Sequence, residues 1–127
     1  MSKIQKGSKK YIADFEKKHS FEVRVTESRK ILDKYPDRIP IVVEKLPINS
    51  ILPDIHKNKF LVPSDLTIAQ FLYVIRRYLK MESANSIYLF CHDNIPATSA
   101  SISTLYNDYK EADGFLYIFY TGDNTFG

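Results

Sequence analysis

The sequence predicts an α+β domain with a four-stranded mixed sheet, on three observations. Four short segments rich in β-branched and aromatic residues, at 38–47, 57–63, 86–93 and 114–122, have the composition of strands. A helical repeat of apolar residues occupies 67–80, and a shorter one precedes the last strand. The chain has 127 residues, 44% of them hydrophobic, which suffices for one core. We therefore expect a single two-layer domain in which one long helix crosses the sheet.

Two helices are expected before the first strand. In "SFEVRVTESRKILDKYP" apolar residues recur three and four apart, Ser20 is the expected N-cap, and Pro36 ends the helix. A shorter helical turn is expected within residues 13–18. The face expected to pack consists of Phe21, Val25, Ser28, Leu32 and Tyr35, whereas Arg24, Glu27 and Lys34 are expected to face water.

The four strands are expected to differ in their place in the sheet. Pro40 and Pro47 bracket "RIPIVVEKLP", which favours a place near a sheet edge or at a strand start. "KNKFLVP" is its expected partner, across a connection too long for a tight hairpin. The third and fourth strands, "SIYLFCHD" and "GFLYIFYTG", are mostly apolar and therefore suit central positions.

The helix at 67–80 has the clearest signals. Thr67 and Gln70 have the spacing of a capping box, in which each side chain binds an amide at the helix start. The residues expected inward are Ile68, Phe71, Leu72, Ile75 and Leu79, and, in the shorter helix, Ile102, Leu105, Tyr106 and Tyr109. The resulting element order is that of the ubiquitin-like β-grasp. A ferredoxin-like fold would need a second crossover helix that matches the first.

No catalytic or metal site is expected. Cys91, His92 and Asp93 are adjacent in a predicted strand, where neighbouring side chains point to opposite faces, so they cannot assemble a nucleophile and its base. Cys91 is expected to be a small buried residue. The three histidines lie on different elements, and the four glycines are isolated, so neither a metal-ligand pattern nor a phosphate loop is present. We predict that the protein is not an enzyme and has no cofactor.

The positive charge belongs to the N-terminus. Residues 1–20 carry a net charge of +4, and the rest of the chain carries −1. A solvated arm is favoured; an arm that touches anionic lipid, nucleic acid or an acidic protein surface is the alternative. Neither a signal peptide nor a membrane-spanning stretch is found, and a lone cysteine suits a reducing compartment such as the cytosol.

The segment "KNKFLVPSDL" has the features of an exposed edge strand. Lys57 and Lys59 would keep such an edge from aggregating, while its backbone groups stay able to pair with an extended peptide. Phe60, Leu61 and Val62 would then line pockets on either side. The alternative is that these apolar residues belong only to the core.

Three stretches carry a resemblance to a known family. "FEVRVTESRKILDKYPDRIPIVVEK", "KFLVPSDLTIAQFLYVIRR" and "DGFLYIFYTGDNTFG" are similar to the GABARAP and yeast autophagy-related protein eight family of ubiquitin-like modifiers, over about residues 20–127. The resemblance implies a β-grasp domain with two added N-terminal helices. We accordingly divide the chain into a basic arm with a short helix (1–19), a ubiquitin-like domain (20–122) and a flexible conjugation tail (123–127).

The resemblance also implies a mechanism for the tail. In this family an activating enzyme adenylates the terminal glycine, a conjugating enzyme receives it as a thioester, and an amide bond joins it to phosphatidylethanolamine. Gly127 has that position, and Phe126 matches the aromatic residue before it. The protein would then be cytosolic when unconjugated and peripheral on autophagosomal membranes when lipidated. A cysteine protease processes and deconjugates family members, and whether Gly127 is encoded last or exposed by cleavage stays open.

The family's peptide groove maps onto this chain residue by residue, and receives the short aromatic-x-x-aliphatic motifs of cargo receptors. The pocket for the aromatic anchor would consist of Glu27, Ile31, Pro40, Val42, Lys59, Leu61 and Phe115. The pocket for the aliphatic anchor would consist of Phe60, Val62, Pro63, Leu66, Phe71 and Val74. The cations that would pair with acidic residues flanking the motif are Arg38, Lys57 and Arg76.

The sequence departs from the family at three places and leaves other functions open. The arm is longer, the loop between Pro47 and Leu52 has one extra residue, and Tyr78 stands where a basic residue is usual. A scaffold that never conjugates and tethers cargo or cytoskeletal partners through the same groove is the alternative function. RNA binding is the third hypothesis, disfavoured because the basic residues are confined to the arm, so no nucleic-acid partner is expected. We expect a monomer in solution.

Overall fold

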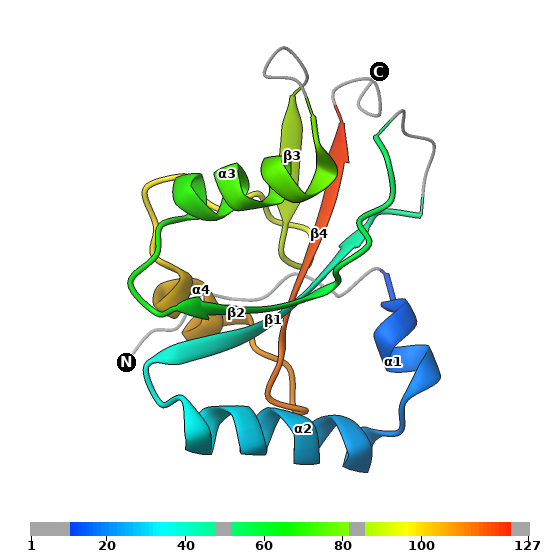
Figure 1. Ribbon diagram of the computed structural model, residues 1–127, viewed down its shortest axis with the longest axis vertical. Helices are drawn as coiled ribbons and strands as arrows, with labels where there is room; N and C mark the ends of the chain where they lie inside the picture. The colour runs from blue at the N-terminus through cyan, green and yellow to red at the C-terminus, as the bar shows by residue number, and fades with distance from the viewer. Residues whose placement is uncertain (1–10, 48–51, 82–85, 123–127) are drawn as a thin grey trace.

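The computed structural model describes residues 11–47, 52–81 and 86–122, which form a mixed sheet and four helices (Figure 1). Their order along the chain is α1 (Asp14–Lys18), α2 (Phe21–Lys34), β1 (Arg38–Lys45), β2 (Lys59–Pro63), α3 (Ile68–Leu79), β3 (Ile87–Phe90), α4 (Ile102–Tyr109) and β4 (Leu116–Gly122). The predicted α+β fold class and element order are confirmed. No helix within the described ranges is long and apolar enough to cross a membrane.

The strands lie in the order β2-β1-β4-β3, with β1 and β4 parallel and the two outer pairs antiparallel. The prediction of an edge position for β2 is confirmed, as is its pairing with β1. Of the two places predicted from the prolines of β1, an edge position is wrong, because β1 lies between β2 and β4, whereas Pro40 does stand near the start of the strand. Its proline is tolerated there because the ladder to β4 starts at Ile41, one residue after Pro40.

β3 is an edge strand and not a central one, contrary to the prediction from its apolar composition. Both of its faces are covered: Ile87 and Leu89 are buried in one core, and Phe90 packs against the other. Strands that are covered on both faces have apolar residues at consecutive positions wherever they lie in the sheet. The composition of a strand therefore indicates whether its two faces are buried, and it does not indicate the position of the strand in the sheet.

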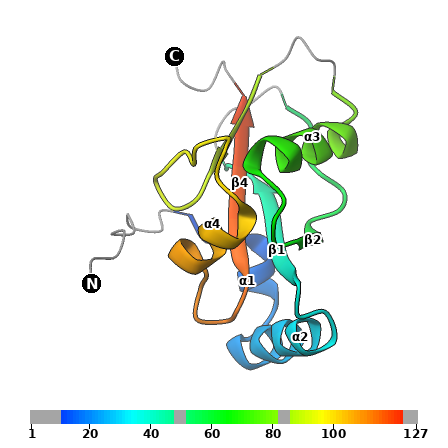
Figure 2. The same ribbon diagram turned by 90° about the vertical axis from the view of Figure 1, so that its left-hand side faces the viewer.

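The core has two parts, one on each face of the sheet. α3 and α4 cover the larger part, which includes Ile39, Ile41 and Val43 of β1. Ala13, the N-cap residue of α1, and Phe15 of α1 join Val42 and the aromatic residues of β4 in the smaller part. Figure 1 shows α4 and α1 on opposite sides of β4, and the turned view of Figure 2 shows α4 in front of the strands and α1 behind them, so the sheet carries helices on both faces, one layer more than we expected.

Local signals place the helix starts as predicted. The Ser20 hydroxyl accepts a hydrogen bond from the amide of Val23. At α3 the Thr67 hydroxyl accepts from the Gln70 amide at 3.1 Å, and the Gln70 side chain accepts from the Thr67 amide at 2.9 Å. This reciprocal pair is the predicted capping box.

The predicted faces of α2 are partly wrong. Ser28 is buried as expected, but Phe21 and Tyr35 are 47% and 37% exposed. The side chain of Arg24, expected in water, is only 14% exposed, because it pairs with a buried carboxylate from the other end of the chain.

α1 is held against the sheet by a carboxylate of β1. The two side-chain oxygens of Glu44 accept hydrogen bonds from the amides of Asp14, at 2.7 Å, and Phe15, at 3.1 Å. These amides stand at the start of α1, where they have no partner within the helix. Part of the predicted arm therefore packs on the domain, and the division at residue 19 stays a prediction.

Candidate functional site

The candidate groove follows β2, the edge strand next to β1. Side chains alternate along it: Phe60 and Val62 lie in the larger core, whereas Lys59 and Leu61 pair across the sheet with Val42 and Pro40. The pleat therefore separates the two predicted pockets, which lie on opposite faces of the same strand.

The residues of the predicted aromatic pocket lie between α2 and β2. Val42 and Phe115 are each 1% exposed and belong to the smaller core, against which Ile31 packs. The Lys59 ammonium lies 2.6 Å from a Glu27 carboxylate oxygen, which links β2 to α2. Buried Val42 and Phe115 thus form a floor, and the charged pair stands at the side.

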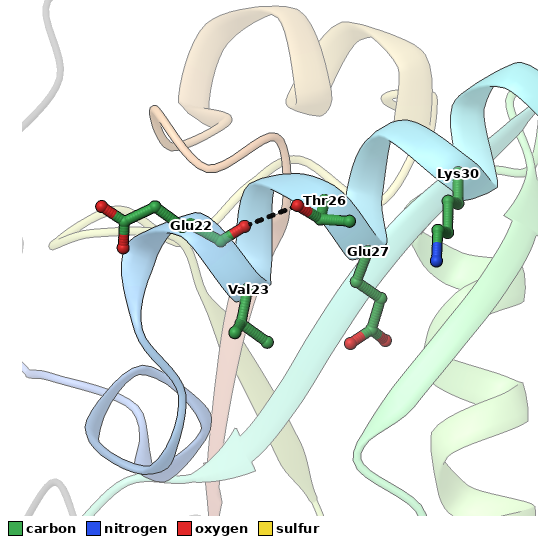
Figure 3. Close-up of a pocket in the computed structure, with 5 residues that line it drawn as sticks. All are labelled: Glu22, Val23, Thr26, Glu27 and Lys30. Atoms are coloured by element: carbon green, nitrogen blue, oxygen red, sulfur yellow. Dashed lines mark hydrogen bonds between the residues drawn. The ribbon is translucent and has the colours of Figure 1, made fainter.

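A surface depression on α2 adjoins this pocket through Glu27. It encloses about 430 Å³ and is lined by Glu22, Val23, Thr26, Glu27 and Lys30. Figure 3 shows Val23, Glu27 and Lys30 pointing to one side of the helix. The sequence analysis missed Val23 and Lys30, although their spacing from Glu27, four and three residues, marks one helical face.

The residues of the predicted aliphatic pocket gather between β2 and α3. The rings of Phe60 and Phe71 meet edge to face at 5.7 Å between centroids, and Val62 is buried beside them. Leu66 and Val74 are half-buried and pack against this floor. Pro63 is exposed at the end of β2.

Tyr78 also packs here, which the sequence did not predict. Its ring lies 5.1 Å from that of Phe60, edge to face, and is 44% exposed. The Lys57 ammonium lies 5.2 Å from the Phe60 ring centroid and 5.3 Å from that of Tyr78. Tyr78 and Lys57 therefore form one wall of the aliphatic pocket.

The three predicted cations do not form one cluster. Arg38 pairs with Pro63 in the sheet register and donates to the Leu61 carbonyl at 3.4 Å. Lys57 lies before the start of β2, and Arg76 is half-buried on α3. Arg38 and Lys57 thus stand at opposite ends of β2, where each could meet a different acid along a bound segment.

A buried charge network fixes α2 to the start of β4. The Asp113 carboxylate has no exposed surface and accepts from Arg24 at 2.6 Å, from the Tyr117 hydroxyl at 2.5 Å and from the Phe115 amide at 2.9 Å. Burial and the hydrogen bond to Asp113 raise the pKa of Tyr117 far above its ordinary value. The network thus links α2 to Phe115, a residue of the predicted aromatic pocket.

Gly114 lets α2 approach this network. Its φ is +91°, and a Cβ built there would lie 2.4 Å from the Ser28 hydroxyl oxygen. That hydroxyl donates to the Asp113 carbonyl at 2.5 Å. Only glycine fits both the backbone conformation and the close approach.

Cys91 and His92 behave as a structural turn. The strand ends at Phe90, and a turn closed by hydrogen bonds between Cys91 and Asn94 follows, with His92 at a φ of +55°. The prediction that Cys91 is buried is confirmed, and burial raises the pKa of its thiol to about 12. His92 Nε2 lies 3.0 Å from a Glu111 carboxylate oxygen.

Within the described ranges no three His, Cys, Asp or Glu side chains are grouped to hold a metal ion. Gly127, the predicted conjugation site, lies outside the described residues.

Comparisons with known proteins identify the family. A family model described as "Autophagy protein Atg8 ubiquitin like" matches residues 23–127. The chain is 47% identical to autophagy-related protein 8 of Candida albicans over 115 residues, which cover 91% of this chain and 84% of that protein.

Solved structures of related proteins agree with this family match. The crystal structure of Trypanosoma brucei ATG8 matches with a TM-score of 0.86 at 38% identity, covering 92% of this chain and all of that one. Plasmodium falciparum Atg8, in complex with a Plasmodium falciparum Atg3 peptide, matches with a TM-score of 0.78 at 36% identity, covering 87% and 96% of the two chains. Because the family model spans residues 23–127 and these solved structures share the fold, the chain belongs to the Atg8 family.

Proposed function

We propose that the protein is a ubiquitin-like modifier that is conjugated through Gly127 to phosphatidylethanolamine. On autophagosomal membranes it acts in membrane expansion and recruits cargo receptors and adaptors that carry aromatic-x-x-aliphatic motifs. It is cytosolic and monomeric before conjugation. The enzymes of the pathway act on it, and it catalyses no step itself.

The observation that best supports the proposed peptide groove is the alternation of side chains between the two faces of the edge strand β2. In an extended peptide, residues three positions apart point to opposite faces. The two candidate pockets lie on opposite faces of β2, with Lys59 and Leu61 on one and Phe60 and Val62 on the other. A segment that pairs with the edge of β2 would therefore direct its aromatic anchor toward α2 and its aliphatic anchor toward α3.

The terminal glycine supports the conjugation. A residue without Cβ leaves its carboxylate open to a nucleotide and then to a cysteine thiolate. The phosphatidylethanolamine amine would attack the resulting thioester, the thiolate would leave, and an amide would remain. Acyl chains then supply the membrane anchorage, about 0.8 kcal/mol for each buried methylene.

The partners follow from this chemistry. An activating enzyme and a conjugating enzyme would hold the tail in turn, and a cysteine protease would process or release it. The structure of Plasmodium falciparum Atg8 with an Atg3 peptide supports a conjugating-enzyme partner for this chain.

Gly127→Ala tests the conjugation. The variant is expected to lose the faster-migrating lipidated band on gels of cell extracts, and mass spectrometry of the C-terminus checks the lipid directly. A normal lipidated band from the variant would overturn the proposal. Normal function after deletion of Gly127 would favour the non-conjugated scaffold.

Leu61→Ala tests the groove. Leu61 is half-buried and pairs with Pro40 across the sheet, so its loss should leave the fold intact. Titration calorimetry with an acidic aromatic-x-x-aliphatic peptide should show binding weakened by about 1–3 kcal/mol, the usual range for a contributing interface residue. Ile95→Ala, an equally apolar change at a 55% exposed position away from the groove, is the matched control. Equal affinities for Leu61→Ala and the control would count against the site.

A further inference from the structure

The first helix, α1, depends on another element for the capping of its start. Its N-cap residue is Ala13, whose side chain has no polar atom to bind the amides that a helix start leaves unpaired. Glu44 of β1 takes that role, because its two carboxylate oxygens accept from the amides of Asp14 and Phe15. A helix of five residues is too short to be stable alone, so α1 is helical only where it is docked. Docking of α1 and formation of its helix are therefore one equilibrium, which Glu44 shifts toward the docked state.

The docked α1 places one aromatic ring against the floor of the candidate aromatic pocket. Phe15 is 4% exposed, and its ring meets that of Phe115 edge to face, with 5.1 Å between the centroids. Phe115 and Val42 form the floor of this pocket, and Phe15 belongs to the same core cluster as both. The floor therefore packs partly on α1, although the predicted pocket includes no residue of α1.

Lys59 links α1 to α2 at the side of the same pocket. Its ammonium lies 5.5 Å from the centroid of the Phe15 ring and 2.6 Å from a carboxylate oxygen of Glu27. The negative face of an aromatic ring attracts an ammonium group at such a distance. If α1 undocks, Lys59 loses one of these two contacts, and Phe115 loses the ring that packs on it. Two residues of the candidate pocket thus owe part of their packing to Phe15.

We propose that Glu44 is a positioning residue of the aromatic pocket, which binds its aromatic anchor at full affinity only while α1 is docked. This role rests on the proposed peptide groove and goes beyond it, because Glu44 acts through Phe15 and needs no contact with the peptide. Binding free energies are reciprocal, so a bound anchor strengthens the docking of α1 by the same factor by which docking strengthens binding. A second partner that displaces α1 would then lower the affinity of the groove.

The test compares two peptides by NMR titration of the full chain, a method that also measures weak binding. The reference peptide carries the aromatic-x-x-aliphatic motif with uncharged flanks, which limits direct effects of the charge removed with Glu44. The second peptide has alanine in place of the aromatic anchor. Glu44→Ala should weaken binding of the reference peptide roughly two- to tenfold, up to the factor by which the docking of α1 weakens. Its affinity for the alanine peptide should stay unchanged, whereas a general loss of stability would lower both affinities alike.

Three further variants separate positioning from the loss of a charge. Glu44→Gln keeps one side-chain oxygen that can accept from the start of α1, so it should restore part of the affinity for the reference peptide. Phe15→Leu keeps an apolar side chain in α1 but removes the ring beside Phe115 and Lys59, so it should weaken the reference peptide as Glu44→Ala does. Asp33→Ala removes an exposed carboxylate from α2 and should keep the wild-type affinities for both peptides.

Amide hydrogen exchange in the wild type measures the reciprocal effect. The reference peptide at saturation should slow the exchange of the Asp14 and Phe15 amides at least by the factor by which Glu44→Ala weakens binding. The alanine peptide at saturation should leave both exchange rates unchanged, because it lacks the anchor that contacts the floor of the pocket.

Three outcomes would overturn the positioning role of Glu44. Unchanged affinity for the reference peptide in both Glu44→Ala and Phe15→Leu, or an equal loss for the two peptides, refutes it, while binding of the reference peptide to the wild type leaves the groove standing. Exchange at Asp14 and Phe15 that does not respond to the reference peptide refutes the linkage. Failure of the wild type to bind the reference peptide refutes the groove and the positioning role together.

Discussion

The buried pair between Arg24 and Asp113 yields the sharpest stability prediction. Arg24→Met keeps the aliphatic stem of the side chain and removes its charge and its hydrogen bond of 2.6 Å. The Asp113 carboxylate, with no exposed surface, would then keep only the Tyr117 hydroxyl and the Phe115 amide as donors. A buried carboxylate without its counter-charge is costly, so the folded state should lose stability.

The structure narrows the expected loss in the free energy of unfolding. Breaking a buried ion pair by removing one partner costs about 3–5 kcal/mol. Two donors remain on Asp113, and the Arg24 side chain is itself 14% exposed, so the cost should be near the lower end of that range, about 3 kcal/mol. In a domain of this size such a loss lowers the Tm by about 10 °C.

Urea denaturation at pH 7 measures the change in the free energy of unfolding. Arg29→Met, on the exposed side of the same helix, is the control and should change it by less than about 0.5 kcal/mol. The double variant Arg24→Met with Asp113→Asn should be at least about 1 kcal/mol more stable than the sum of the single effects predicts. A loss below about 1 kcal/mol for Arg24→Met, or strict additivity, would refute the account of the network.

Two further predictions concern α1 and alkaline pH. Glu44→Ala removes both acceptors from the start of α1, so the amide hydrogen of Asp14 should exchange with solvent about five- to tenfold faster, as measured by NMR. The control Glu22→Ala should leave this exchange rate unchanged. Equal rates in both variants would contradict the docking of α1. Burial raises the pKa of the Cys91 thiol from 9.0 to about 12. The folded state therefore retains a proton that the unfolded state releases, so stability should be full below pH 9 and fall as the pH rises toward 12. The Tm, measured as a function of pH, should fall less steeply above pH 9 in Cys91→Ala than in the wild type. An unchanged slope of Tm against pH would show that Cys91 does not contribute.

Features set by neighbours in the chain were predictable from the sequence. The capping box of Thr67 and Gln70 needs only two residues three positions apart, and it forms as expected. Ser20 likewise caps α2. The edge position of β2 was predictable because lysines flank and start a short apolar run, a local device against aggregation.

Features set by distant partners were not predictable. Arg24 was assigned to water because it lies on the polar side of the helical repeat, yet its partner is 89 positions later in the chain. Pro40 left two places open for β1, near an edge or with the proline at the strand start, and only the register with β4 decides between them, because that pairing begins one residue later. Hydrophobic periodicity reports that a face is covered, and it does not report which element covers it.

Tyr78 shows how this limit bears on function. The spacing of Phe71, Val74 and Tyr78 places them along one side of α3, which the sequence alone reveals. Whether Tyr78 contacts solvent or forms a wall of the groove depends on β2 lying beside that side, and the 5.1 Å contact with Phe60 decides it. A phenol at this position adds apolar surface to the pocket and leaves Lys57 and Arg77 to supply the positive charge. We therefore predict that the proposed groove binds acidic peptides through Lys57, and titration calorimetry of Lys57→Ala with an acidic peptide and its neutral counterpart measures that dependence.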